Sequence, residues 1–211
     1  MKHKKFLFWT SLVILLPTII GLLLWNQLPD KLPTHWGFDG QVDGWNSKPF
    51  GVFAVPLILL VFQWICVFVT RLDKQNQTGS NEKVLSLVLC IFPVLSLLTG
   101  LGMYGSALGW EFSVSEAMPA LIGVMFLVIG NMLPKCRQNS YLGIRLPWTF
   151  ASEENWNKTH RLGGKVWMAS GAAMLVSVLL DWVWLFLAAI LAAALIPTVY
   201  SWLLYRKQNQ R

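Results

Sequence analysis

The stretch "VWMASGAAMLVSVLLDWVWLFLAAILAAALIPTVYSWLLY" spans residues 166–205 and decides the fold, because only Asp181 interrupts its apolar character. A single helix of this length would run roughly 60 Å, twice the thickness of the hydrocarbon core of a bilayer. The chain must therefore turn back near Asp181. Trp182 beside it suits the headgroup layer, where an indole keeps its ring in apolar surroundings and its N–H near water. The stretch predicts two membrane-spanning helices, Val166–Leu180 and Trp182–Tyr205.

The rest of the chain has a similar composition. Of its 211 residues, 55% are hydrophobic and only 13% are charged, which is about half the charged fraction of an ordinary soluble domain. Four further apolar stretches reach the ~20 residues that cross a bilayer: Phe6–Trp25, Phe50–Thr70, Val84–Leu108 and Val114–Leu133. The sequence thus predicts an all-α integral membrane protein, with six transmembrane helices in a single membrane domain over residues 1–211.

The distribution of basic residues predicts the orientation. When the six spans alternate in direction, all but two of the 17 lysines and arginines fall on one side of the membrane. The exceptions are Lys31 and Lys48. Loops rich in Lys and Arg remain in the cytoplasm, so both termini are expected there. The isoelectric point of 9.5 reflects this loop bias, and it does not call for a nucleic-acid partner.

Several chemistries are disfavoured by the residues present. The predicted spans contain almost no ionisable side chain, which argues against an ion-coupled pump. The three cysteines are scattered, so we expect reduced thiols, no metal centre and no cofactor. An enzyme with a site at Arg145, Glu153 and His160 is the least favoured hypothesis. No nucleophile–base pair, metal motif or phosphate-binding loop is recognisable in the sequence.

The predicted outer loop, residues 27–49, is rich in Gly, Pro and Asp, which are typical of tight turns. His35, Asp39 and Asp43 supply one imidazole and two carboxylates, a partial ligand set for a cation. The alternative is that both Asp residues cap turns and that His35 satisfies a local backbone group. The sequence favours this alternative, because the spacing of no known metal motif is present.

Aromatic side chains accompany these polar residues in the outer loop. Trp36, Phe38 and Trp45 predict either an aromatic lid at the membrane interface or an apolar docking surface for a peptide. The candidate residues for binding a ligand or partner in this loop are His35, Trp36, Asp39, Asp43 and Trp45.

The predicted inner loop, residues 134–165, contains a helix of its own. Ser152 is a suitable N-cap, and two glutamates follow in the first turn. His160 and Arg161 fall in the last turn, and Gly163-Gly164 is expected to end the helix. The charges at both ends therefore match the helix dipole.

One face of this predicted helix carries an aromatic ring and an imidazole. Trp156 and His160 are four residues apart, and Asn155 and Thr159 lie beside them. This face either rests on the floor of the helix bundle or forms a recognition surface.

The segment ahead of the helix is expected to be extended or turned, because Pro147 disfavours helix at Leu146. Asn131, near the inner end of the fourth span, is predicted to be a buried polar group that bonds a neighbouring helix or anchors the loop. The positive charge of the loop favours contact with anionic lipid headgroups over an acidic or phosphorylated protein partner. The candidate residues of the inner-loop motif are Asn131, Lys135, Asn139, Gly143, Arg145, Pro147, Trp148, Trp156, His160 and Arg161.

A family resemblance rests on these motifs. "GNMLPK" (130–135), Asn139, "GIRLPWTF" (143–150), Trp156 and "KTHRLGG" (158–164) resemble the SdpI family, membrane immunity proteins against a secreted sporulation-delaying peptide toxin. "LPTHWGFDGQVDGWNSK" (32–48) resembles the small two-span domain DUF1648, which often precedes it. The resemblance divides the chain into a DUF1648-like two-helix part, residues 1–70, and an SdpI-like four-helix part, residues 84–211.

The resemblance implies a multi-pass protein of the bacterial plasma membrane. In the best-known member of the family, the protein protects the producing cell from the toxin, and it also holds a cytoplasmic repressor at the membrane when toxin is present. A cationic, hydrophobic peptide would meet an acidic, aromatic outer loop, and a cytoplasmic regulator would meet a basic inner loop. Transmission between them requires two packing states of the helices, each of which binds one partner better.

A rival hypothesis is a transporter of a small molecule or peptide. Spans one to three and four to six both begin with a helix that ends in Leu-Pro, followed by a long loop that contains Trp-Asn and Thr-His pairs. Three spans per half would give the halves opposite topology, and such 3+3 inverted repeats support alternating access in transporters. The order of the shared pairs differs between the two loops, which weakens this hypothesis.

Overall fold

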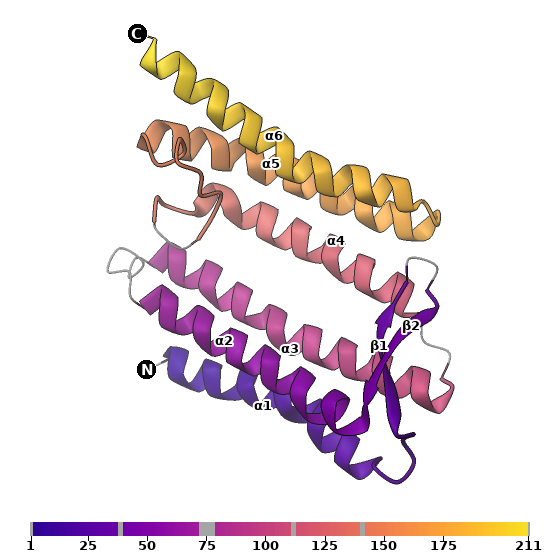
Figure 1. Ribbon diagram of the computed structural model, residues 1–211. Helices are drawn as coiled ribbons and strands as arrows, with labels where there is room; N and C mark the ends of the chain where they lie inside the picture. The colour runs from indigo at the N-terminus through magenta and orange to yellow at the C-terminus, as the bar shows by residue number, and fades with distance from the viewer. Residues whose placement is uncertain (1, 38–39, 72–78, 111–112, 140–141, 211) are drawn as a thin grey trace. The chain divides into compact units, whose positions relative to one another are not determined.

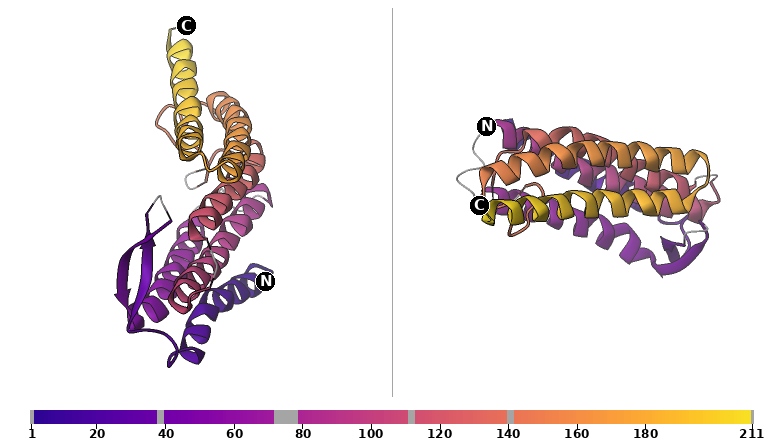
Figure 2. Two further views of the ribbon diagram at one scale, coloured as in Figure 1. Left: turned by 90° about the vertical axis from the view of Figure 1, so that its right-hand side faces the viewer. Right: turned by 90° about the horizontal axis from the view of Figure 1, so that it is seen from above.

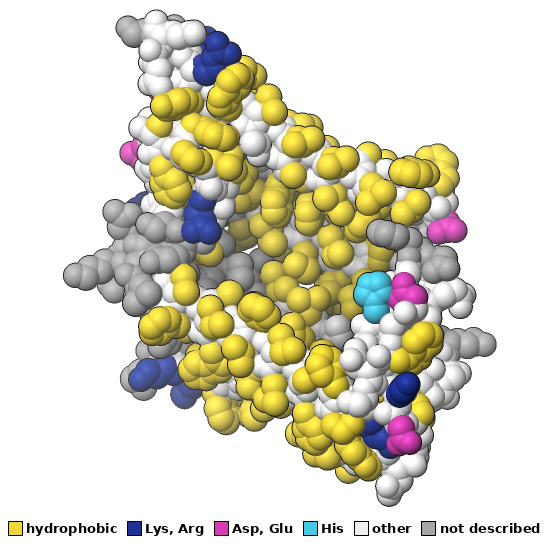
Figure 3. Space-filling model, viewed as in Figure 1, with side chains coloured by type: hydrophobic (Ala, Val, Ile, Leu, Met, Phe, Trp, Pro, Cys, Tyr) yellow, Lys and Arg dark blue, Asp and Glu magenta, His cyan; other side chains and the backbone are white. Residues whose placement is uncertain are grey.

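The computed structural model describes residues 2–37, 40–71, 79–110, 113–139 and 142–210 (Figure 1). Six long helices dominate this part of the chain: α1 (Lys2–Leu23), α2 (Val55–Arg71), α3 (Gly79–Leu108), α4 (Val114–Met132), α5 (Glu153–Leu179) and α6 (Val183–Asn209). Each is long and apolar enough to cross a membrane, which confirms the predicted all-α class with six transmembrane helices. In Figure 3, hydrophobic side chains cover the visible helix surfaces, as expected for a protein that faces lipid.

The helices form two compact units. The first comprises residues 1–69 and 85–118, and the second comprises residues 70–84 and 119–211. The first unit therefore contains α1, nearly all of α2, most of α3 and the first residues of α4, and the second contains the rest of α4 with α5 and α6.

Three helices meet in the first unit. Leu7 of α1, Val67 of α2 and Leu89 of α3 form one buried cluster. Polar side chains of α3 satisfy α1 carbonyls around Pro17, since Ser96 Oγ donates to Ile14 O at 2.7 Å and Tyr104 Oη donates to Pro17 O at 2.8 Å. A proline inside a helix removes one of its backbone hydrogen bonds, and these two bonds hold α3 to α1 around Pro17.

A β-hairpin joins α1 to α2 and was not foreseen as such from the sequence. Strand β1 (Lys31–Trp36) pairs with strand β2 (Val42–Ser47) in an antiparallel two-stranded sheet (Figures 1 and 2). The π-helical turn η1 (Phe50–Ala54) then leads directly into α2. The Gly, Pro and Asp residues of this segment predict turns. The two strands have little alternation of apolar and polar residues, so the pattern that normally predicts strands is missing.

In the second unit, α4 and α5 approach closely at two pairs of glycines. A Cβ atom on Gly171 would lie 2.6 Å from the carbonyl oxygen of Gly123, and one on Gly164 would lie 2.7 Å from that of Gly130. Glycine at these positions allows two membrane helices to pack backbone against backbone. Helix α6 packs against α5 in an antiparallel pair (Figure 1).

The expected end of a helix at Gly163-Gly164 is wrong. Helix α5 begins at the predicted N-cap, since Ser152 Oγ accepts a hydrogen bond from the backbone of Asn155, but it continues without a break to Leu179. Both glycines are buried, and a Cβ on Gly163 would lie 2.6 Å from Ile144 Cδ1. They serve close packing and do not terminate the helix, so the predicted cytoplasmic helix and the fifth span are one element.

Candidate functional site: the hairpin segment and the α4–α5 loop

Two segments carry the candidate residues, and each is built within one unit. We name residues 27–49 the hairpin segment and residues 133–152 the α4–α5 loop. The hairpin segment belongs to the first unit, and the α4–α5 loop belongs to the second.

Lys48 anchors the end of the hairpin segment to the turn that follows α1. Its ammonium group donates to the carbonyl oxygens of Leu28 at 2.7 Å and Trp25 at 3.1 Å, and it lies 5.2 Å from the centroid of the Trp25 ring. The Lys48 side chain is only 12% exposed, and the carboxylate of Asp30 lies 3.7 Å away. The ammonium group therefore satisfies two backbone carbonyl oxygens in the irregular segment just beyond α1. In the sequence, Lys48 was noted only as one of the two basic residues on the predicted outer side.

The two tryptophans of the hairpin segment have different roles. Trp36 is partly buried and packs against the core cluster of Leu28, Leu32 and Val52. Trp45, on β2, is 55% exposed. Of these two tryptophans, only Trp45 can contribute to the predicted aromatic surface, because Trp36 belongs to the core. Phe38 lies outside the described residues.

His35 and Asp43 lie together on the hairpin. The imidazole Nδ1 and the Asp43 carboxylate are 2.5 Å apart, and both side chains are largely exposed, at 73% and 53%. Asp39, the third member of the predicted cation site, lies outside the described residues. Among the described residues, no group of three His, Cys, Asp or Glu side chains is arranged to hold a metal.

The α4–α5 loop begins with the 3₁₀ turn η3 (Leu133–Lys135) and is organised by Asn139. The side-chain amide of Asn139 donates to Arg137 O at 2.7 Å and Leu142 O at 3.0 Å, and its oxygen accepts from Leu142 N at 2.6 Å. Asn139 is 1% exposed. The role of Asn139 in the motif is therefore structural, because its side chain both donates to and accepts from backbone groups of the turn.

His160 fixes the next part of the loop to α5. The backbone N–H of Ile144 donates to His160 Nε2 at 2.9 Å, so that nitrogen carries no proton and Nδ1 is the protonated one. His160 Nδ1 lies 2.8 Å from the carbonyl oxygen of Trp156, to which it donates. Both ring nitrogens of a neutral imidazole are thus satisfied inside the protein.

Gly143 allows this contact. Its φ of +107° is a conformation that L side chains rarely adopt, and a Cβ there would lie 2.3 Å from His160 Nε2. Only glycine at this position lets the backbone approach the imidazole.

The face predicted to rest on the bundle or to recognise a partner is buried. Trp156 is fully buried, its ring stacks on that of His160 at a centroid distance of 4.1 Å, and its Nε1 donates to Cys136 O at 2.9 Å. Burial raises the pKa of the Cys136 thiol, while the hydrogen bond with Asn139 lowers it. The hypothesis that this face is itself a recognition surface is therefore wrong, since its side chains are consumed by internal contacts.

Asn155 and its neighbours connect α5 to α6. Asn155 Nδ2 donates to Ser201 O at 2.9 Å, and its oxygen accepts from the hydroxyls of Thr159 and Ser201 at 2.9 and 2.8 Å. Asn155, Thr159 and Ser201 are completely buried. A buried amide with this many partners fixes the register of the two helices.

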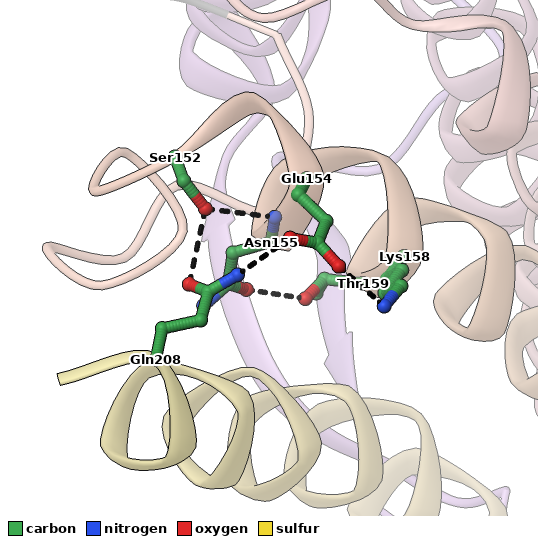
Figure 4. Close-up of polar contacts among 6 residues, drawn as sticks. All are labelled: Ser152, Glu154, Asn155, Lys158, Thr159 and Gln208. Atoms are coloured by element: carbon green, nitrogen blue, oxygen red, sulfur yellow. Dashed lines mark hydrogen bonds and ion pairs between the residues drawn. The ribbon is translucent and has the colours of Figure 1, made fainter. Parts of the chain in front are cut away.

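A second, more exposed layer continues the link at the end of α6 (Figure 4). The N-cap Ser152 donates to Gln208 Oε1 at 3.1 Å, Gln208 Nε2 donates to Glu154 at 3.2 Å, and Glu154 pairs with Lys158. The sequence did not identify Ser201 or Gln208, because their partners lie 46 to 56 residues away.

The remaining motif residues differ in their surroundings. Asn131 is exposed, so the expectation of a buried polar group there is wrong. The exposed residues of the motif also include Lys135, Arg145, Pro147 and Arg161. Trp148 is partly buried, and its indole Nε1 has no hydrogen-bond partner in the described part of the chain.

Thr149 is a buried residue that the sequence did not single out. Its hydroxyl accepts from Leu146 N at 2.8 Å and lies 2.7 and 3.0 Å from the carbonyl oxygens of Leu146 and Ile144. Its place inside the motif "GIRLPWTF" is the one signal that could have revealed it.

Comparisons with known proteins match both segments. Residues 135–201 match the SdpI/YfhL protein family, and residues 12–60 match the domain of unknown function DUF1648. The chain is 24% identical over 201 residues to the immunity protein SdpI of Bacillus subtilis (strain 168). The aligned region covers 94% of this chain and 95% of the SdpI chain. No solved structure is significantly similar to the chain.

The matched regions coincide with the two segments described above. The DUF1648 match contains the hairpin segment, and the SdpI/YfhL match contains the α4–α5 loop from Lys135 onward, all of α5 and most of α6. The predicted resemblance is thereby confirmed: the chain is a multi-pass membrane protein in which residues 12–60 resemble DUF1648 and residues 135–201 resemble the SdpI/YfhL protein family.

Proposed function

We propose that this protein protects a bacterium against a secreted antimicrobial peptide, which it binds on the hairpin segment. The observation that carries the proposal is the similarity to an immunity protein over 94% of this chain. A role in immunity requires no catalytic constellation, and the histidines that suggested chemistry, His35 and His160, have structural partners of their own.

The proposed orientation places the hairpin segment outside the cell. Its support is the distribution of Lys and Arg, which leaves only Lys31 and Lys48 on that side. Lys48 is buried against the turn that follows α1, so its charge contributes little to the surface. The exposed groups of the hairpin segment then include two carboxylates, Asp30 and Asp43, and the indole of Trp45. Such a surface suits a cationic, apolar peptide.

On the cytoplasmic side, we assign signalling to the exposed surface of the α4–α5 loop and the first turns of α5. The exposed bases Lys135, Arg137 and Arg161 belong to this surface. They suit an acidic regulator or anionic headgroups. Trp156, Asn155 and His160 hold the surface in shape from within.

The test is a protection assay. The chain is expressed in a Bacillus strain that lacks its own immunity protein, and growth is followed in the presence of purified sporulation-delaying peptide toxin. Wild-type protein is expected to restore growth, and Trp45→Ala is expected to weaken protection. Leu179→Ala, an exposed apolar residue at the end of α5, is the matched control. Equal sensitivity with and without wild-type protein in the membrane would contradict the proposal.

A further inference from the structure

The hairpin segment has one edge that remains open to another strand. Beyond the register pair Lys31 and Ser47, Lys48 N donates to Asp30 O at 2.8 Å. In an antiparallel pair, residues whose backbone groups point to the partner strand alternate with residues whose groups point away. The backbone N–H and C=O groups of Trp45 and Ser47 therefore point away from β1, and no hydrogen bond from a third element to either backbone is present in the described part of the chain.

The opposite edge of the hairpin is protected. By the same alternation, the outward-facing residues of β1 are Lys31 and Pro33. Proline has no N–H to offer, and lysine on an edge disfavours the addition of a strand. Strand β2 contains neither residue type. The two edges thus differ in their capacity to accept a further strand.

The bulges limit the open edge to a short length. The register shifts leave Thr34 of β1 and Asp43 of β2 without a partner on the other strand. Bulges disrupt a ladder locally and redirect side chains. On β2, the residues from Gly44 to Ser47 each have a partner on β1. Asp43, at the end of this stretch, directs its carboxylate to the imidazole of His35.

The side chains beside the edge indicate what it would bind. Trp45 is 55% exposed, and Asp43 is 53% exposed. We propose that Gly44–Ser47 accepts an extended segment of a peptide as a third β-strand, with main-chain hydrogen bonds to Trp45 and Ser47, an apolar side chain on the Trp45 ring and a cationic side chain near Asp43. The occupant is the secreted peptide of the proposed function, on which this inference rests.

A pair of proline substitutions tests the edge. Ser47→Pro removes an outward N–H on β2, and Lys31→Pro removes one on β1, from residues that lie opposite each other. With purified protein in lipid nanodiscs and the purified sporulation-delaying peptide toxin, Ser47→Pro is expected to weaken binding about tenfold. Lys31→Pro is expected to change binding less than about twofold by the same reasoning.

Amide hydrogen exchange on the wild-type protein tests the same inference without a substitution. The amides of Trp45 and Ser47 are expected to exchange quickly in the free protein and slowly with the peptide bound. Unchanged exchange at both amides in the complex would overturn the inference, as would equal binding by both proline variants. Protection that appears without peptide and rises with protein concentration would also overturn it, since the edge would then pair with a second copy.

The two proposals fail in different ways. If the wild-type protein protects cells and binds the peptide while Ser47→Pro does so equally well, immunity stands and strand addition is wrong. If the wild-type protein neither protects nor binds, both proposals are wrong.

Discussion

At the scale of single residues, the protein uses uncharged polar side chains to hold irregular backbone in place. His160, Asn139 and Thr149 each bond backbone groups in the α4–α5 loop, where helix or sheet hydrogen bonds are absent. Inside a protein an unpaired backbone group is costly, because it has lost its hydrogen bonds to water. We therefore expect these residues to respond strongly to substitution although they bind no ligand.

Gly143→Ala is the sharpest test of the His160 contact. The substitution strains a backbone at φ +107° and places a methyl group on the imidazole, which together should cost about 3 kcal/mol of unfolding free energy. Gly109→Ala is the matched control, because Gly109 also has a positive φ but nothing lies within 4 Å of its added Cβ. Thermal unfolding in mild detergent measures both variants. Equal destabilisation would show that the imidazole contact contributes nothing.

Asn155→Ala should destabilise the pairing of α5 with α6. The substitution leaves Ser201 O and the hydroxyl groups of Thr159 and Ser201 without a buried partner, at a cost of about 2 kcal/mol. Asn157→Ala, on the exposed side of the same helix, is expected to be neutral. The midpoint of thermal unfolding in detergent decides between them, and equal midpoints would refute the role assigned to Asn155.

The Cys136 thiol is expected to be inert in the folded protein. Burial raises its pKa, so the thiolate fraction near pH 8 is smaller than in an exposed cysteine. A maleimide should label Asn157→Cys rapidly at this pH and leave Cys136 unlabelled until denaturant is added. Mass spectrometry identifies the labelled cysteine. Labelling of both sites at similar rates would contradict the buried position of Cys136.

At the scale of elements, α6 contains a proline that leaves a backbone carbonyl oxygen without its usual donor, and a side chain of α5 donates to that oxygen instead. Pro197 has no N–H to donate to the carbonyl oxygen of Ala193, four residues earlier. Trp167 of α5 donates to that oxygen at 3.0 Å, and its ring stacks on Phe126 of α4 at 4.6 Å. One indole therefore joins three helices at the point where α6 lacks a backbone hydrogen bond.

A double-mutant cycle isolates this bond. Trp167→Phe removes the donor and should cost about 1 kcal/mol. In a Pro197→Ala background the backbone N–H of residue 197 satisfies Ala193 O, so the same substitution should cost less. Trp184→Phe, at an indole that is 79% exposed, serves as the control. Additive effects of the two substitutions on the free energy of unfolding would argue that Trp167 does not replace the hydrogen bond lost at Pro197.

The elements also show what the sequence could predict. The spans are recognisable because about 20 consecutive apolar residues are a signal that needs no partner. The start of α5 is also recognisable, from Ser152 and two glutamates. Its uninterrupted continuation past Gly163-Gly164 is not, because the glycines are explained by the close approach of Gly130 and Ile144, which only the fold brings near.

The candidate site was predictable to a smaller extent. Asn139, Gly143, Trp156 and His160 stood out by type, yet their roles depend on one another and on backbone groups up to 20 residues away. Lys48 and Ser201 had no signal of their own. Lys48 donates to carbonyl oxygens 20 and 23 residues earlier in the chain, and Ser201 bonds the side chain of Asn155 on another helix. Trp36 and Trp45 looked alike in the sequence and differ only because the hairpin packs one of them.

At the scale of the whole molecule, the proposals depend on which end of the helices faces the exterior. The hairpin segment can meet a secreted peptide only if it lies outside, and the α4–α5 loop can meet a regulator only if it lies inside. The asymmetry of Lys and Arg predicts both placements.

Labelling of single cysteines on intact cells tests this orientation most directly. In a variant without Cys66, Cys90 and Cys136, Asp30→Cys reports on the hairpin segment and Asn157→Cys on α5, both at exposed positions. A membrane-impermeant maleimide is predicted to label residue 30 on intact cells and residue 157 only after the membrane is opened. Labelling of residue 157 but not residue 30 on intact cells would contradict the account.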